Sequence, residues 1–180
     1  MITHVTGNVV KEPLDAFIHQ ANCFCTMRSG VAKEVKETYP GVYEADCKTK
    51  KGDPSKMGTF SFAKTHDGKV GYNLYSQYDF GRDGKLRTVY SDIKKGLSNI
   101  RKHIQVNIKP NARVGIPCRM GCARGGGDWN EVLKIITETF ENTDIEVVIC
   151  ELNEYSTEAD DFLKKARAAY KKAELMGEEL

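Results

Sequence analysis

A glycine-dense loop between an expected strand and an expected helix constrains the fold of this chain more than any other feature. The loop follows the apolar run Val114–Pro117 and contains four glycines, Gly121, Gly125, Gly126 and Gly127. Glycine lets a backbone bend where a Cβ atom would clash. Apolar residues then recur at helical spacing from 128 to 142. The loop should therefore end at a helix N-terminus, where backbone N–H groups attract an anion such as phosphate.

The order of the glycines narrows the kind of anion site. They form neither the phosphate-loop motif, which ends in Gly-Lys-Ser or Gly-Lys-Thr, nor a clean Gly-x-Gly-x-x-Gly motif. ATPase and nicotinamide-cofactor functions therefore lose support. An ordinary tight turn between a strand and a helix remains the alternative explanation.

Apolar patterning along the rest of the chain predicts alternating strands and helices. Short apolar or alternating runs indicate strands at 2–5, 16–19, 58–63, 70–75, 114–117 and 145–150. Helical spacing indicates helices at 31–39, 42–50, 89–104 and 128–142. This alternation predicts a three-layer α/β fold. Ligands bind beyond the carboxyl ends of the strands in such sheets, so the loops at 22–30 and 121–127 could share one ligand.

Length and charge limit the remaining possibilities. A chain of 180 residues fits one domain with its own core. Its 27 basic and 25 acidic residues nearly balance, which gives no bulk attraction to nucleic acid. No apolar run approaches the roughly 18–20 residues that span a membrane, and the first residues do not resemble a secretion signal. We expect a soluble cytoplasmic monomer without a membrane partner.

The composition changes after Leu152. Charged residues dominate there, with a narrow apolar stripe at helical spacing. This pattern predicts a C-terminal helical extension at 153–180, separate from a domain at 1–152. The lysines of the extension are more typical of a solvated helix face than of a nucleic-acid site.

The chain has six cysteines, Cys23, Cys25, Cys47, Cys118, Cys122 and Cys150. A domain with a core of this size needs no disulfide bonds, so we expect free thiols. The first two and the pair at 118 and 122 could be imagined as zinc ligands, but neither pair has the usual C-x2-C spacing. We expect neither a metal nor a cofactor.

Four segments taken together resemble the macrodomain family of ADP-ribose-binding modules. They are ITHVTGNVV at 2–10, HQANCFCTMRSGVA at 19–32, NLYSQYDFGRDG at 73–84 and IPCRMGCARGGGDW at 116–129. The resemblance covers residues 2–152. It is strongest to the small branch with terminal ADP-ribose glycohydrolases, ADP-ribose-1''-phosphate phosphatases and short bacterial and phage proteins. It implies a three-layer α/β/α fold with a mixed central sheet and ADP-ribose across the crest of that sheet.

The resemblance also implies which residues hold the ligand. Asn8, Val9 and Leu152 would lie near the adenine, and Tyr75 and Ser76 would line the floor of the site. The diphosphate and distal ribose would lie between two loops. The loop residues concerned are Asn22, Met27, Ser29, Gly30 and Val31 on one side and Gly121, Cys122, Ala123, Arg124, Gly125 and Gly126 on the other.

Several positions depart from the family pattern. Gln77 and Gly125 stand where the glycohydrolases are thought to carry a lysine and an aspartate, and neither replacement supplies a nucleophile or a base. Arg28 and Arg124 stand where glycine and leucine are frequent, and their guanidinium groups could bind the diphosphate or lie outward in water. Asn8 replaces a common aspartate, and an amide oxygen accepts a hydrogen bond less strongly than a carboxylate.

Four residues are candidates for catalysis. Asn22 could orient a water at the distal ribose. His19 could shuttle a proton, although a histidine inside an apolar strand is commonly a hydrogen-bonded core residue. Asp83 and Asp128 could act as bases, but Asp83 lies in turn-forming sequence and Asp128 suits a helix N-cap. The sequence leaves the catalytic group open.

These residues support an ADP-ribose-binding domain that could hydrolyse ADP-ribosyl adducts or ADP-ribose-1''-phosphate by water attack at the distal ribose. The alternative is a non-catalytic module that reads or sequesters ADP-ribose or a related nucleotide. A third possibility, an RNA-binding surface, rests on a group of basic and aromatic residues, Tyr75, Tyr78, Phe80, Arg82, Lys85 and Arg87.

Overall fold

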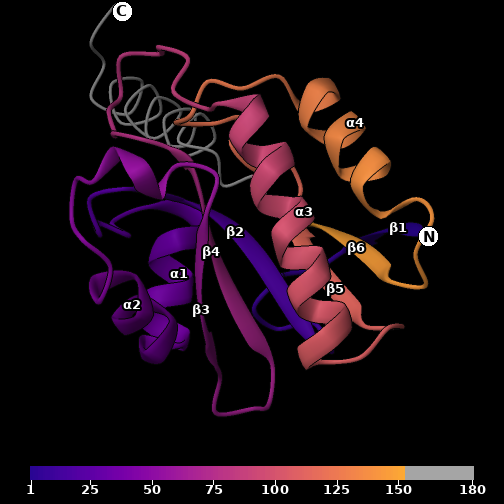
Figure 1. Cartoon of the computed structure of the whole chain (residues 1–180). Helices are drawn as coiled ribbons and strands as arrows, with labels where there is room; N and C mark the ends of the chain where they lie inside the picture. Colours follow the sequence, from indigo (N-terminus) through magenta and orange to yellow (C-terminus); the bar gives the residue numbers. More distant parts are fainter. Residues whose placement is uncertain (153–180) are drawn as a thin grey trace, which may run out of the picture.

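A mixed six-stranded sheet forms the centre of the protein. The computed structural model describes residues 1–152. The strands are β1 (Ile2–Thr6), β2 (Ala16–Asn22), β3 (Phe60–Lys64), β4 (Val70–Gln77), β5 (Arg113–Pro117) and β6 (Glu146–Glu151). Their order across the sheet is β1-β6-β5-β2-β4-β3 (Figure 1). All neighbouring strands run parallel except β3 and β4, which form an antiparallel hairpin.

Helices cover both faces of this sheet (Figure 1). The helices are α1 (Gly30–Thr38), α2 (Pro40–Cys47), α3 (Tyr90–Asn107) and α4 (Trp129–Phe140), with a short 3-10 helix η1 (Pro54–Lys56) before β3. Consecutive residues of β2 pack into the cores on opposite faces of the sheet. Phe17 belongs to the core cluster beneath α1 and α2, whereas Ile18 belongs to the cluster beneath α3 and α4. The prediction of a three-layer α/β fold with a mixed sheet is confirmed.

Helix α3 shows how the apolar pattern produces this packing. Ile93, Leu97, Ile100 and Ile104 recur every three or four residues and are all fully buried. Burying one such side chain stabilises a fold by about 1.5–3 kcal/mol, so this stripe fixes α3 against the sheet.

Several element bounds differ from the predicted ones, among them those of β2 and α2. Strand β2 was predicted to end at residue 19 but continues to Asn22. Its last polar side chains have partners, since Gln20 bonds to Gln77 and Asn22 to Thr26. Helix α2 begins at Pro40 rather than at residue 42. Proline fits the first position of a helix, because the N–H group that it lacks would have no partner within the helix at that position.

The helical extension predicted at 153–180 lies outside the described residues. Within residues 1–152, no helix has the length and apolar character needed to cross a membrane.

Candidate functional site

A cavity of about 650 Å³ opens at the carboxyl ends of β2, β4 and β5. These strands contribute residues 19–22, Gln77 and Pro117 to its wall. Two connections on opposite sides border it, here called the first loop (residues 23–29, between β2 and α1) and the second loop (residues 118–128, between β5 and α4). Phe80, Gly81 and Arg82, from the connection between β4 and α3, also border it. Ligands of open α/β sheets bind at this edge.

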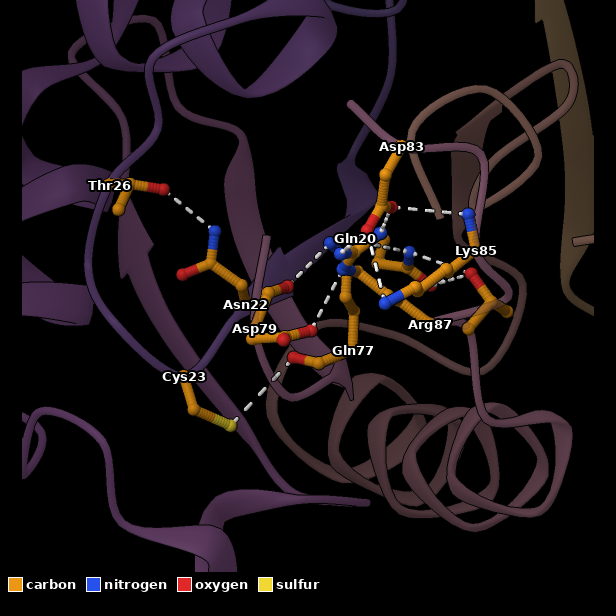
Figure 2. A network of polar contacts seen from close by, with 10 residues as sticks. Gln20, Asn22, Cys23, Thr26, Gln77, Asp79, Asp83, Lys85 and Arg87 are labelled. Atoms are coloured by element: carbon orange, nitrogen blue, oxygen red, sulfur yellow. Dashed lines mark hydrogen bonds and ion pairs between the residues drawn. The ribbon is translucent and has the colours of Figure 1, made fainter. Parts of the chain in front are cut away.

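The first loop is held by the side chain of Asn22. The Asn22 amide nitrogen donates to the Thr26 hydroxyl at 2.7 Å (Figure 2). Its amide oxygen accepts the backbone N–H of Phe24 at 2.8 Å. The loop leads into α1, whose N-cap residue Ser29 makes no side-chain capping bond. The N–H groups of the first turn of α1 are therefore suited to bind an anion.

The second loop packs closely against Arg87 and Thr88. The carbonyl oxygen of Gly125 accepts the N–H groups of Arg87 and Thr88 at 2.8 and 3.0 Å, and the Thr88 hydroxyl donates to the Gly121 carbonyl at 2.7 Å. A Cβ atom on Gly125 would lie 2.2 Å from the Thr88 hydroxyl oxygen and 2.5 Å from the Gly121 carbonyl oxygen. This position has room only for glycine.

A polar network centred on Gln20 joins the strands to the second loop (Figure 2). The Gln20 amide nitrogen donates to Gln77 at 2.9 Å and to the Thr88 hydroxyl at 3.1 Å. The Ser76 hydroxyl donates to the Gln20 amide oxygen at 2.7 Å, and the Gln77 amide nitrogen donates to the carbonyl of Asp79 at 2.6 Å. The network fixes the loop relative to β2 and β4.

The charged residues that border the cavity are mostly arginines. Arg28, Arg82, Arg119 and Arg124 border it, and Asp46 is the only carboxylate that does so among the described residues. The sequence left two orientations open for Arg28 and Arg124, and the structure places both in the cavity wall. Guanidinium groups pair well with phosphate oxygens, so this wall suits an anionic ligand.

Known proteins resemble the chain in sequence and in fold. No family model matches it. It is 31% identical over 157 residues to an uncharacterized 17.5 kDa protein of Enterobacteria phage T4, a match that covers 83% of the chain and 95% of the phage protein. It is 28% identical over 149 residues to an ADP-ribose glycohydrolase of Bos taurus, covering 82% of the chain and 90% of the enzyme.

Solved structures share the fold. The macrodomain of Thermus aquaticus DarG has a TM-score of 0.67 at 21% identity, covering 84% of this chain and 98% of that one. Thermosipho africanus DarTG in complex with ADP-ribose has a TM-score of 0.66 at 18% identity, covering 84% of this chain and 42% of that one. The chain belongs to the macrodomain family.

Most of the predicted loop residues of this macrodomain border the cavity. They are Asn22, Met27, Ser29, Gly30 and Val31 on the side of the first loop and Gly121, Ala123, Arg124 and Gly125 on the side of the second. The structure thus brings both groups to one space, and their contact with a ligand remains a prediction.

Two residues expected on the floor do not border the cavity. Tyr75 and Ser76 are buried, and their hydroxyl groups bond inside the protein. The Tyr75 hydroxyl donates to a carboxylate oxygen of Asp46 at 2.6 Å, and the Ser76 hydroxyl donates to Gln20. They support wall residues from beneath instead.

The three residues expected near the adenine also lie outside the cavity wall. The Asn8 side chain donates to Glu34 of α1 and accepts the N–H of Val10 at 3.0 Å. Val9 is buried in the core beside α1 and α2, and Leu152 is exposed directly after β6. An adenine contact by these residues stays a prediction.

Cys122 and Gly126 of the second loop do not border the cavity. Cys122 packs against the core, where burial raises the pKa of its thiol to about 11. Gly126 lies against the backbone of Lys85. A Cβ atom on Gly126 would lie 2.8 Å from the Lys85 carbonyl oxygen.

Neither aspartate proposed as a base borders the cavity. Asp128 is the N-cap of α4 and accepts the N–H of Asn130 at 2.8 Å. The Asp83 carboxylate accepts hydrogen bonds from the Arg87 guanidinium and the Lys85 N–H, and the bond from Arg87 contributes most to lowering the pKa of Asp83. Both side chains make structural hydrogen bonds outside the cavity wall, and a role for either of them as a catalytic base stays a prediction.

His19 borders the cavity although it is buried. Its Nε2 lies 2.6 Å from the Asn73 amide oxygen. Burial lowers the pKa of His19 to about 4, so its imidazole is neutral near pH 7. The residue is both hydrogen-bonded in the core and close to the candidate site.

The surface considered for RNA binding is only partly formed. Tyr75 is buried, and the Arg87 side chain pairs with Asp79 and Asp83. Tyr78 and Phe80 are exposed and pack edge-on against Phe24 beside the cavity.

A disulfide bond joins Cys25 of the first loop to Cys47 at the end of α2. The expectation of free thiols throughout is therefore wrong for these two residues, and Cys25 is not available as a metal ligand. The free cysteines of the described residues are Cys23, Cys118, Cys122 and Cys150. The bond forms because α2 packs beneath the first loop, a contact that the cysteine spacing does not reveal.

Sequence reasoning missed several residues of the wall. Gln20, Thr26, Asp46 and Arg119 border the cavity and were not predicted to do so. Gln20 and Thr26 lie inside the segment 19–32 that carried the family resemblance, so that segment could have indicated them. Asp46 lies in α2, and the sequence pattern there indicates that an acidic residue belongs to a solvent-exposed helix face.

Proposed function

We propose that this macrodomain binds ADP-ribose with the diphosphate between its two loops. The cavity wall supports this proposal, because it combines backbone N–H groups at the start of α1 with the side chains of Arg28 and Arg124. A structural neighbour, Thermosipho africanus DarTG, is a complex with ADP-ribose. The observation that carries the proposal is the single cavity bordered by both loops.

We further propose that the protein hydrolyses an ADP-ribosyl adduct. The bovine relative is an ADP-ribose glycohydrolase. Water would attack the anomeric carbon of the distal ribose while the bond to the attached group breaks. The electrons of that bond leave with the attached group, which takes up the proton that the water loses. The diphosphate contacts would position the substrate for this step. A lysine adduct has no support, because Gln77 occupies the position expected for that lysine.

A non-catalytic reader of ADP-ribose is the second candidate function, and two observations favour it. Gly125 has no space for the carboxylate expected there. Gln77 is bonded to Gln20 and to the carbonyl of Asp79. Such a site could bind a nucleotide sugar without an activated nucleophile.

Replacing Asn22 with alanine tests the enzymatic proposal. Asn22→Ala removes both bonds that shape the first loop and leaves the N–H of Phe24 without its partner. We expect release of ADP-ribose from an ADP-ribosylated protein to fall by about tenfold or more, measured with purified protein under initial-rate conditions. Asn142→Ala, at an exposed position after α4, is the control and should retain full turnover.

Calorimetry with ADP-ribose separates the remaining outcomes. Binding by the wild-type protein without turnover of ADP-ribosylated protein or of ADP-ribose-1''-phosphate would support the reader. Neither binding nor turnover would refute both candidate functions.

A further inference from the structure

Two buried polar atoms at the cavity have no hydrogen-bond partner among the described residues. They are Nδ1 of His19 and Oδ2 of Asp46. Both residues border the cavity, and each is only 1% exposed. Buried polar atoms of native proteins are almost always hydrogen-bonded, so two exceptions beside one cavity indicate a common purpose.

The fold places these two residues on adjacent levels of the same face. His19 of β2 is in register with Asn73 of β4, and Tyr75 lies two residues further along β4 on the same face. Asn73 donates to the carbonyl of Val42 in α2. Asp46 follows Val42 by one helical turn and bonds to Tyr75. The two side chains therefore lie between the sheet and α2, beneath the first loop.

The contacts of Asn73 determine what His19 can offer. The Asn73 amide nitrogen donates to the carbonyl of Val42 at 2.9 Å and to the Ser61 hydroxyl at 3.0 Å. Its amide oxygen must then accept a hydrogen bond from Nε2 of His19. A neutral imidazole protonated at Nε2 has a lone pair at Nδ1, so the unpartnered atom of His19 is an acceptor.

Asp46 offers a second acceptor. One of its oxygens accepts the Tyr75 hydroxyl at 2.6 Å, which fixes the direction of the other. Burial raises the pKa of Asp46, while the bond from Tyr75 and the charge of Lys56 oppose that rise. Lys56 is itself buried, with its ammonium 4.5 Å from the centre of the Tyr75 ring. An ionised carboxylate has only acceptor positions.

We propose that His19 and Asp46 form an acceptor pair that binds hydroxyl groups of the distal ribose of ADP-ribose, a proposal that rests on the function proposed above. Two neighbouring acceptors require a ligand with neighbouring donors, and the adjacent hydroxyls of a sugar supply them. A phosphate offers acceptors and negative charge, which the Asp46 carboxylate opposes. The pair would therefore recognise the sugar and disfavour a phosphate beside it.

The position of the pair agrees with this role. The second loop follows β5, near the middle of the sheet, whereas Asp46 bonds to β4, on the side away from β1 and β6. A ligand with its diphosphate between the loops and its adenine toward β1 would extend its distal sugar toward β4. Ala21 is in register with Tyr75 and borders the same cavity as the pair.

Comparison of ADP-ribose with ADP, which lacks the distal ribose, tests the acceptor pair by calorimetry. We expect the wild-type protein to bind ADP-ribose at least about tenfold more tightly than ADP. Asp46→Asn should weaken ADP-ribose binding by about tenfold and leave ADP binding unchanged, because the charged acceptor is lost. Asp53→Asn is the matched control, since it removes a nearby charge outside the cavity wall and asparagine can keep the bond to the Ser55 N–H.

Each outcome bears on one proposal or on both. Equal wild-type affinity for ADP and ADP-ribose, or equal weakening of both ligands by Asp46→Asn, would overturn the acceptor pair and leave nucleotide binding standing. A wild-type protein that binds neither ligand would overturn the pair together with the proposed function. His19→Leu is the second variant if circular dichroism shows that Asp46→Asn does not fold, and the same selective loss is expected.

Discussion

Reduction of the disulfide between Cys25 and Cys47 is expected to lower the free energy of unfolding by about 3 kcal/mol. The bond joins residues separated by 22 positions, and a cross-link of this span restricts the unfolded chain by roughly that amount. ADP-ribose affinity should fall as well, because the first loop would lose its covalent tie to α2. The hydrogen bond from the Tyr43 hydroxyl of α2 to the Cys25 carbonyl is long at 3.5 Å.

Urea denaturation with and without dithiothreitol measures this effect. Cys47 is exposed, so a reductant can reach the bond. The double variant Cys25→Ser with Cys47→Ser is the control, and its stability should match that of the reduced wild-type protein and not respond to dithiothreitol. An unfolding midpoint of the wild-type protein that does not change on reduction would contradict the assigned role of the bond.

The fold followed from the sequence wherever one physical pattern dominated. The stripe of Ile93, Leu97 and Ile100 predicts α3 because a helix at that spacing can bury one face. The run from Val114 to Pro117 predicts β5 for the equivalent reason in a strand. The predicted bounds of β2 were wrong where polar side chains find hydrogen-bond partners on other elements, as Gln20 does. Apolar patterning carries no information about such partners.

The candidate site was predictable only in part. The loops could be located because their glycines and flanking elements are local features of the sequence. The hydrogen bond of Tyr75 to Asp46 could not be predicted, because it depends on α2 covering the face of β4 from which the Tyr75 side chain projects. Asp46 was missed for the same reason, and so was the pairing of Cys25 with Cys47. Each of these depends on a contact between residues more than 20 positions apart.

Replacing Gly125 with alanine is expected to lower the free energy of unfolding by about 1–3 kcal/mol and to weaken ADP-ribose binding. The added Cβ atom would lie 2.2 Å from the Thr88 hydroxyl oxygen and 2.5 Å from the Gly121 carbonyl oxygen. Neither atom can retreat freely, because Thr88 donates to Gly121 and also bonds to Gln20. Overpacking of this kind typically costs that much. The aspartate of the glycohydrolases should fit still less well.

Chemical denaturation and calorimetry of the same variant separate two explanations for the glycine. Gly41→Ala is the matched control, because its Cβ atom would meet nothing within 4 Å and it lies in α2. A helical alanine there should leave stability unchanged or raise it. If Gly125→Ala kept wild-type stability but lost ADP-ribose binding, the Cβ atom would project into the cavity, and glycine would be needed for ligand access instead of packing against Thr88. Loss of both properties together is the result that the present geometry requires.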